Sequence, residues 1–246
     1  MDAPARHVAF DPVTLQALHA GSVGGDGATM EPAMRLALDA SFGSVERWRE
    51  AFVAMGRAPG GSGCLLLVFQ PRAGTLVNQW SDDPAPAVAG CMPILALDPS
   101  QQARPAGPDA GADAGVDRFM RHIDWAAVYE RYQRAVHAAS ELFGAGHDEI
   151  GGALLFDVRR AGVFEQARSM IPGARWRDPA AVGNWSAALP PGRDVVVYCV
   201  YGHEVGRATA MRLRAAGLNA RYLRGGIDGW LAAGWPWVDK TASTRP

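Results

Sequence analysis

The chain has 246 residues, of which 48% are hydrophobic and 20% charged, a composition typical of a globular protein with a substantial core. Its 24 Lys and Arg residues nearly balance 25 Asp and Glu residues, and no basic block stands out, so we expect neither a nucleic-acid nor a membrane partner. The longest apolar runs, such as 64–69, fall far short of the roughly 20 residues of a membrane-spanning helix. The N-terminus lacks the pattern of a secretion signal, so we expect a cytoplasmic location.

Helical periodicity comes first along the chain and is followed by strand-like runs. Residues 31–55 have the spacing of two helices separated by a break at Gly43-Ser44. The apolar run 64–69, a turn, and the segment 75–80 then predict a β-hairpin. The first half is therefore expected to contain both helices and strands.

A composition change suggests where the two halves of the chain meet. Residues 101–115 consist almost wholly of Ala, Gly, Pro, Asp and Gln, which cannot repay ordering entropy by burial, and they predict a flexible loop. Helical spacing resumes over 116–143, and Gly144-Ala145-Gly146 is expected to end that helix. We therefore predict two domains, residues 1–146 and 147–246.

The second half alternates short apolar runs with helical or Pro/Gly-rich stretches. The runs at 153–158, 195–200 and 220–223 are the expected strands. This alternation predicts an α/β fold with a parallel sheet covered by helices.

Cys199 has the most informative surroundings of the three cysteines. It follows an expected strand and precedes a Gly-containing loop and a helix predicted to run from about Val205 to Gly217. Loop amides and a helix N-terminus favour a thiolate, so Cys199 is a candidate nucleophile. The alternative is a small buried hydrophobe, which is the commoner role of cysteine and the one expected for Cys64, while Cys91 is expected to be an inert loop residue.

Four motifs in order resemble the rhodanese, or sulfurtransferase, family over residues 148–240. They are Asp157-Val158-Arg159, Ile171-Pro172-Gly173-Ala174, the loop that starts at Cys199, and the segment 222–230. The resemblance implies a doubly wound parallel sheet and a Cys199 that carries sulfane sulfur as a persulfide. It further implies a small sulfane-sulfur donor, a thiol or other nucleophilic acceptor, and no cofactor. Asp157 and Arg159 are expected to support the loop and the sheet.

The expected substrate-binding loop follows Cys199 and consists of Val200, Tyr201, Gly202, His203, Glu204 and Val205. Related phosphatases place an Arg seventh in a loop of this kind, whereas Val205 stands there and provides no bidentate phosphate clamp. Glu204 stands where single-domain sulfurtransferases often have Arg, and its charge opposes both a thiolate and an anionic donor such as thiosulfate. His203 is either an exposed loop residue or a proton donor to the leaving group.

The first half resembles the C-terminal α/β part of the iron and manganese superoxide dismutases over residues 8–136. The matching segments are Phe42-Gly43-Ser44, Gly61 to Val68, Asn78-Gln79, Pro93 to Asp98, Ile123 to Val128 and Arg131-Tyr132. In that family one Asp and three His bind the metal. Asp98 matches the Asp, but Gln102 stands where the last His is expected, and the remaining histidines show no ligand spacing. Gln79 matches a residue that hydrogen-bonds the metal-bound solvent in the manganese enzymes, and without a metal it would have no such role.

The sequence thus predicts an α+β superoxide dismutase-like domain without a metal, with Asp98 as a lone vestigial ligand, joined to a sulfurtransferase. The first domain would be a structural or partner-binding module, and a homodimer through it is expected from the dimers of the parent family. Two alternatives stay open at this point. One is a non-catalytic sensor or interaction protein with a silenced rhodanese site, and the other is a residual superoxide dismutase.

Overall fold

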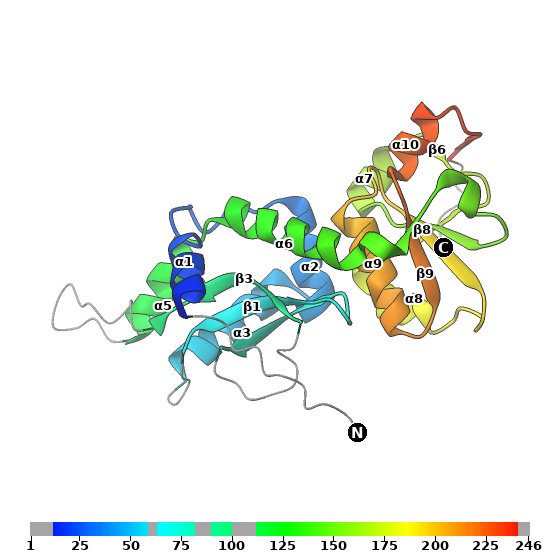
Figure 1. Ribbon diagram of the computed structural model, residues 1–246. Coiled ribbons are helices and arrows are strands. Elements are labelled where there is room, and N and C mark those ends of the chain that lie inside the picture. Colours follow the sequence, from blue (N-terminus) through cyan, green and yellow to red (C-terminus); the bar gives the residue numbers. More distant parts are fainter. Residues whose placement is uncertain (1–11, 59–62, 82–89, 100–111, 241–246) are drawn as a thin grey trace, which may run out of the picture. The chain divides into compact units, whose positions relative to one another are not determined.

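The computed structural model describes residues 12–58, 63–81, 90–99 and 112–240 (Figure 1). The chain divides into two compact units, one made of Met1–Gln70 with Leu76–Tyr132 and the other of Pro71–Thr75 with Gln133–Pro246. Each unit buries its own hydrophobic core. The division between the units falls inside helix α6 (Trp125–Ser140), and the predicted domain limit at 146/147 stays a prediction.

The first unit combines a three-stranded sheet with helices. Its strands lie in the order β2-β1-β3 and its elements are β1 (Leu65–Gln70), β2 (Thr75–Trp80), β3 (Met92–Leu97), α1 (Pro12–Ala20), α2 (Pro32–Phe42), α3 (Val45–Arg57), α5 (Ala112–Arg121) and α6 (Trp125–Ser140), the last shared with the second unit. The predicted neighbouring strands β1 and β2 are confirmed. The break between α2 and α3 is also confirmed: Gly43 adopts φ 89° and the Ser44 side chain accepts the Arg47 backbone N–H.

The central strand β1 explains the longest apolar run of the sequence. Residues 65–69 are all buried, and β1 pairs with β3 in antiparallel register, with Leu66 opposite Ala96. A strand with neighbours on both edges that is buried on both faces reads as a continuous apolar run. No helix among the described residues has the length and apolar character needed to cross a membrane.

Two expectations about residues 101–146 are wrong where the structure describes them. The helix expected over 116–143 is interrupted, because the Asp124 side chain accepts the Ala127 backbone N–H at 3.1 Å and starts α6 as a new helix. Gly144-Ala145 does not end a helix but forms strand β4, which is fully buried. Of the expected flexible loop, residues 112–115 are helical in α5, and 101–111 lie outside the described residues.

The second unit is a doubly wound α/β domain, as predicted. Its sheet has the order β4-β9-β8-β5-β7, with every neighbouring pair parallel, and its strands are β4 (Gly144–Ala145), β5 (Leu154–Asp157), β7 (Arg175–Trp176), β8 (Asp194–Tyr198) and β9 (Asn219–Leu223). The other elements are α7 (Ala161–Gln166), α8 (Val182–Ser186), α9 (Glu204–Ala215), α10 (Gly226–Ala232), the short helices η2 (Glu141–Phe143), η3 (His147–Glu149) and η4 (Pro179–Ala181), and the paired strands β6 (Ser169–Met170) and β10 (Val238–Asp239).

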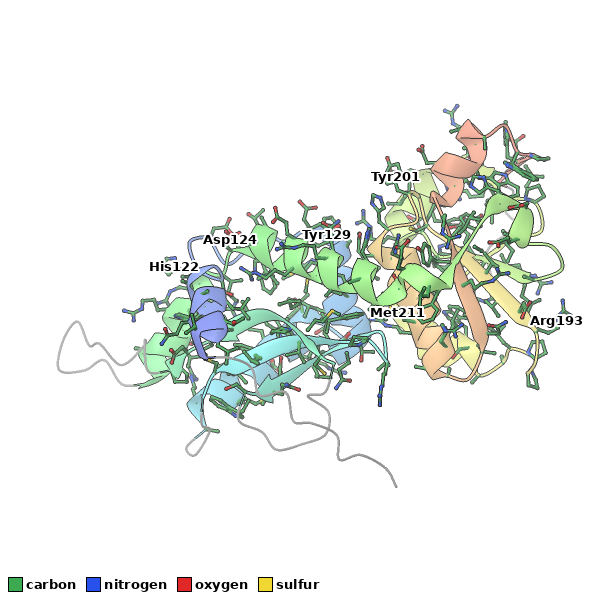
Figure 2. The ribbon with its side chains drawn as sticks, viewed as in Figure 1. His122, Asp124, Tyr129, Arg193, Tyr201 and Met211 are labelled. Atoms are coloured by element: carbon green, nitrogen blue, oxygen red, sulfur yellow. The ribbon has the colours of Figure 1, made fainter. Side chains whose placement is uncertain are left out.

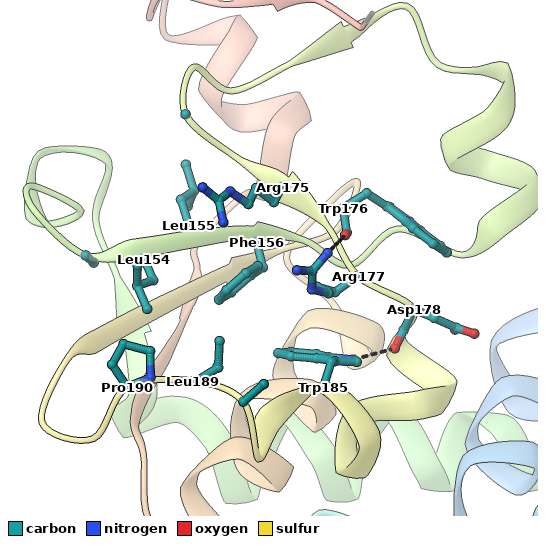
Figure 3. A pocket seen from close by; sticks show the side chains of 13 residues that line it. Leu154, Leu155, Phe156, Arg175, Trp176, Arg177, Asp178, Trp185, Leu189 and Pro190 are labelled. Atoms are coloured by element: carbon teal, nitrogen blue, oxygen red, sulfur yellow. Dashed lines mark hydrogen bonds between the residues drawn. The ribbon is translucent and has the colours of Figure 1, made fainter. Parts of the chain in front are cut away.

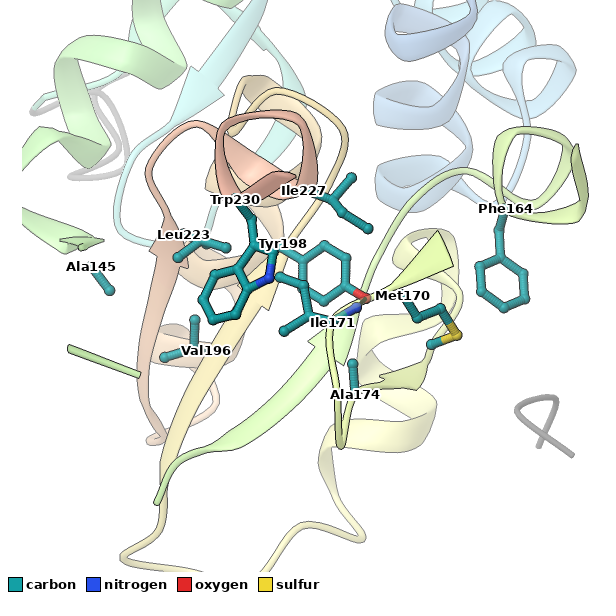
Figure 4. Close-up of a cluster of buried hydrophobic side chains, with 10 residues drawn as sticks. All are labelled: Ala145, Phe164, Met170, Ile171, Ala174, Val196, Tyr198, Leu223, Ile227 and Trp230. Carbon is teal, nitrogen blue, oxygen red and sulfur yellow. Dashed lines mark hydrogen bonds between the residues drawn. The ribbon is translucent and has the colours of Figure 1, made fainter. Parts of the chain in front are cut away.

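Alternation along β8 supplies a core on each face of this sheet. Val196 and Tyr198 pack with Ile227 and Trp230 of α10 on one face (Figure 4), whereas Val195 and Val197 pack on the other face with residues of α9. Because helices cover both faces, β8 is buried throughout except at its first residue. This rigid central strand fixes the position of the residue that follows it, Cys199.

Candidate active site

The loop after β8 is held in place by the start of α10. The backbone carbonyls of Cys199 and Val200 accept the N–H groups of Ile227 and Asp228 at 3.0 and 2.9 Å. The motif found at 222–230 therefore acts on the cysteine loop through main-chain hydrogen bonds. Loop and helix start form one structural feature although they are distant in sequence.

Two glycines allow this close approach of backbones. Gly202 adopts φ 70°, and a Cβ atom there would lie 2.6 Å from the Leu223 carbonyl oxygen. Gly226 adopts φ 57°, and a Cβ atom there would lie 2.6 Å from the Cys199 carbonyl oxygen. Both the backbone conformation and the space exclude a side chain at these positions.

Cys199 is buried, with 6% of its surface exposed. Burial raises the pKa of its thiol, while hydrogen bonds from the backbone N–H groups of Gly206, Gly202 and His203 lower it in part. The amides expected to favour a thiolate are therefore present. The expectation of a net lowered pKa is nevertheless wrong, because desolvation of a sulfur anion outweighs those amides here.

Glu204 begins α9 and is also buried, with 6% exposed. Its carboxylate accepts a hydrogen bond from Gln133 Nε2 at 3.3 Å, and its charge raises the pKa of Cys199, in the direction expected from the sequence. Gln133 comes from the end of α6 that belongs to the second unit. Sequence analysis gave no indication of Gln133, since it lies 71 positions earlier in the chain.

The aromatic residues of the loop lie on its exposed side. Tyr201, labelled in Figure 2, is 57% exposed, and its ring centroid lies 5.7 Å from that of His203. His203 is exposed and also lies 5.6 Å from the His137 ring. Val205 is half-buried, and its carbonyl accepts the Thr209 hydroxyl. An exposed His203 fits both alternatives left open for it, so its role as a proton donor stays a prediction.

Arg207 is a site residue that the sequence analysis missed. Its Nε donates to the Gly202 carbonyl at 3.0 Å, its Nη1 donates to Ser140 Oγ at 3.1 Å, and its guanidinium lies 4.2 Å from the centre of the Tyr222 ring. It therefore ties the middle of the cysteine loop to the first turn of α9. Its position three residues after Glu204 was the only sequence signal available.

Asp157 and Arg159 form a buried ion pair at the end of β5, the strand next to β8. Arg159 Nε lies 2.9 Å from both carboxylate oxygens, and its Nη2 also donates to the carboxylate and to the Ser169 carbonyl. The guanidinium lies over the Phe164 ring as well. The pair joins the end of β5 to β6, and its supporting role in sulfur transfer stays a prediction.

Among the described residues of the first unit, Asp98, His19 and Gln79 lie where the superoxide dismutase resemblance bears on a metal site. Asp98 follows β3 and is buried, and its backbone N–H donates to His19 Nδ1 at 3.2 Å. The structure thus places His19 beside Asp98, for which the sequence had indicated no neighbouring ligand. Gln102 lies outside the described residues. The Nε2 of buried Gln79 has no hydrogen-bond partner among the described residues.

The described part of the chain contains no group of three or more His, Cys, Asp or Glu side chains that could hold a metal ion. A histidine and an aspartate fall short of the closed ligand sets that hold transition metals in proteins. The residues described here therefore do not fit the iron or manganese that this fold family implies, and we derive no chemistry from such a metal.

Comparison with protein families agrees with both halves of this architecture. Residues 139–233 match the model of the rhodanese-like domain, and residues 30–131 match that of the iron/manganese superoxide dismutases, C-terminal domain. The chain therefore joins a domain of the superoxide dismutase C-terminal type to a rhodanese-like domain, as the sequence motifs predicted.

Curated relatives match the first half of the chain. An iron superoxide dismutase of Cupriavidus metallidurans is 46% identical over 113 residues, which cover 46% of this chain and 57% of that protein. A manganese superoxide dismutase of Halobacterium salinarum is 39% identical over 115 residues, covering 46% and 54%. This chain thus spans little more than half the length of these relatives.

Solved structures are similar to part of the chain. A full-length protein from Lactobacillus plantarum is 22% identical, with 44% of this chain and 97% of that chain covered and a TM-score of 0.39. A rhodanese-related protein from Thermoplasma volcanium is 20% identical, with 39% and 96% covered and a TM-score of 0.35.

Proposed function

We propose that the second unit is a sulfurtransferase in which Cys199 carries sulfane sulfur as a persulfide. The observation that carries this proposal is the convergence of three backbone N–H groups, those of Gly202, His203 and Gly206, on the Cys199 sulfur. Such amides stabilise negative charge without a cation and suit a sulfur that alternates between thiolate and persulfide anion.

The transfer proceeds by two displacements at sulfur. The Cys199 thiolate forms a bond to the outer sulfur of a donor R–S–SH while the S–S bond of the donor breaks, and RS⁻ leaves with the bonding electron pair and takes up a proton. An acceptor thiolate then bonds to the outer sulfur of the Cys199 persulfide and returns Cys199 as a thiolate. Neither step requires an external oxidant, a metal or a cofactor.

The buried charge of Glu204 favours a donor of low charge. A carboxylate that already raises the pKa of Cys199 also repels a dianion approaching the same sulfur. We therefore propose a neutral or singly charged persulfide as donor and a small thiol as acceptor, in place of thiosulfate.

Formation of the acceptor persulfide tests this proposal on the full chain. With an alkyl persulfide as donor and a different thiol as acceptor, we expect catalysed formation of the acceptor persulfide by the wild type and none above background by Cys199→Ser. Cys64→Ser, a variant of a buried cysteine in the other unit, should keep the wild-type rate. Equal rates for the wild type and Cys199→Ser would refute a role for Cys199.

The burial of Cys199 favours one second candidate, a non-catalytic domain with a silenced thiol. A thiol whose pKa is raised by burial reacts slowly, as a structural cysteine does. In this candidate the chain would act as a sensor or interaction protein and would form no acceptor persulfide in the test above.

For the first unit we propose a structural or partner-binding role without a bound metal, in place of superoxide dismutase activity. The support is that the described residues offer His19 and Asp98 but no third ligand beside them. A homodimer through this unit is part of the same proposal, and sedimentation equilibrium of the full chain would test it.

A further inference from the structure

A pocket of about 640 Å³ lies in the second unit, away from the cysteine loop. It opens along β5 and β7 and is closed by the residues that follow α8 (Figure 3). Leu154, Leu189 and Pro190 contribute aliphatic walls. No residue from 199 to 205 lines it, so it is a different site from that of the proposed sulfur transfer.

The floor of the pocket is aromatic. The rings of Phe156 and Trp185 lie 5.4 Å apart at an angle of 47°. The indole N–H of Trp185 is already donated to the Asp178 carbonyl at 2.9 Å, so this side chain offers its ring to a ligand and not its polar group. The volume lies within the range of small-molecule sites, and such a floor suits a flat apolar group.

The charged side chains at the pocket are mainly cationic. The Arg177 guanidinium lies 5.9 Å from the centre of the Phe156 ring and donates to the Trp176 carbonyl at 3.1 Å, and Arg175 is exposed beside it. Neither arginine forms an ion pair with a described residue. The acidic lining residue, Asp178, already caps a turn by accepting the Ala180 N–H at 2.9 Å.

We propose that this pocket binds a small molecule made of a flat apolar ring system that bears a carboxylate. The ring packs against Phe156 and Trp185, and the carboxylate pairs with Arg177, whose planar guanidinium matches carboxylate geometry. The assignment does not depend on the chemistry of Cys199, because the two sites share no residue.

Calorimetric titration of the full chain with two matched probes tests the assignment. Naphthoate carries the ring and the charge, whereas naphthylmethanol carries the ring alone. We expect saturable binding of naphthoate at one site, about tenfold tighter than that of naphthylmethanol, because a charge-assisted hydrogen bond is lost with the carboxylate. Equal affinities, or no saturable binding of naphthoate, would overturn the assignment.

Variants locate the binding and separate it from misfolding. Arg177→Gln should bind both probes equally, while Arg193→Gln, which changes an exposed arginine of the same unit (Figure 2), should keep the preference. Ala188→Trp places a large ring into the pocket from an exposed position and should abolish binding of both probes with an unchanged circular dichroism spectrum. Undiminished binding by Ala188→Trp, or a retained preference in Arg177→Gln, would place the probes elsewhere. Cys199→Ser should bind like the wild type even if sulfur transfer fails.

Discussion

At the scale of single residues, the Cys199 sulfur is subject to two opposed effects. Burial removes the water that would solvate an anion, and three backbone N–H groups replace part of that solvation. The pKa of the thiol rises, so desolvation is the larger effect on the resting thiol.

Gly206 offers the sharpest test at this scale. A Cβ atom there would lie 3.3 Å from the Cys199 sulfur, which leaves no room for a second sulfur on that side. We expect Gly206→Ala to load sulfur at least tenfold more slowly, by mass spectrometry, because the added methyl group crowds the Cys199 sulfur.

Gly183→Ala is the matched control, because nothing lies within 4 Å of a Cβ atom at that helical position. It should load sulfur at the wild-type rate. Normal loading by Gly206→Ala would show that the sulfur does not extend toward α9.

Glu204 sets the charge next to the sulfur. Glu204→Gln keeps an acceptor for Gln133 but removes the negative charge, so the pKa of Cys199 should fall and its alkylation profile should move to lower pH. At a fixed pH below that pKa the iodoacetamide rate should rise, because a larger fraction of Cys199 is then the reactive thiolate. Glu165→Gln, at an exposed position, should leave the profile unchanged. An unmoved profile for Glu204→Gln would show that the Glu204 charge does not affect the pKa of Cys199.

At the scale of elements, the loop depends on three neighbours that fix its ends and middle. α10 holds the carbonyls of Cys199 and Val200, Arg207 holds that of Gly202, and the Asp157–Arg159 pair secures the adjacent end of β5. The contacts from α10 join segments that are distant in sequence, whereas the other two are local. The loop is therefore preorganised by the sheet and its helices, a condition for a site that must hold charge.

The buried pair predicts a large loss of stability when one charge is removed. Asp157→Asn leaves the Arg159 guanidinium buried without its counter-charge, which should lower the free energy of unfolding of the second unit by about 3–5 kcal/mol in urea. Glu149→Gln, which weakens the more exposed contact with Arg221, should cost less than about 1 kcal/mol. Similar small losses for both variants would show that the buried ion pair contributes little to the free energy of unfolding.

The sequence predicted elements with a regular pattern and missed features that depend on partners far along the chain. The alternation in 153–158 and 195–200 was enough to predict the parallel sheet, and Gly43-Ser44 was enough to predict the helix break. Nothing local indicated that Gly144-Ala145 pairs with β9, that Gln133 reaches Glu204, or that burial outweighs the loop amides at Cys199. These outcomes depend on tertiary packing, which no periodicity encodes.

At the scale of the whole molecule, the chain joins two domains that differ in the reactive or metal-binding residues that they offer. The rhodanese-like unit retains a cysteine, a supporting loop and main-chain donors, whereas the described residues of the superoxide dismutase-like unit provide no group of metal ligands. The proposed activity accordingly belongs to the second unit, and the proposed structural or binding role to the first.

Metal content tests that division of roles. We predict that elemental analysis of the purified full chain, expressed with added iron and manganese, finds far less than one metal per chain and that superoxide dismutation stays at background. Asp98→Ala should show the same metal content and rate as the wild type. Stoichiometric iron or manganese that is lost in Asp98→Ala would contradict the proposed metal-free unit.

The most direct measurement for the central claim is the intact mass of the full chain after brief incubation with an alkyl persulfide. The account predicts a gain of one sulfur atom, mapped by peptide analysis to Cys199, absent in Cys199→Ser and reversed by excess thiol. An unmodified Cys199, or extra sulfur found only on Cys64 or Cys91, would contradict it.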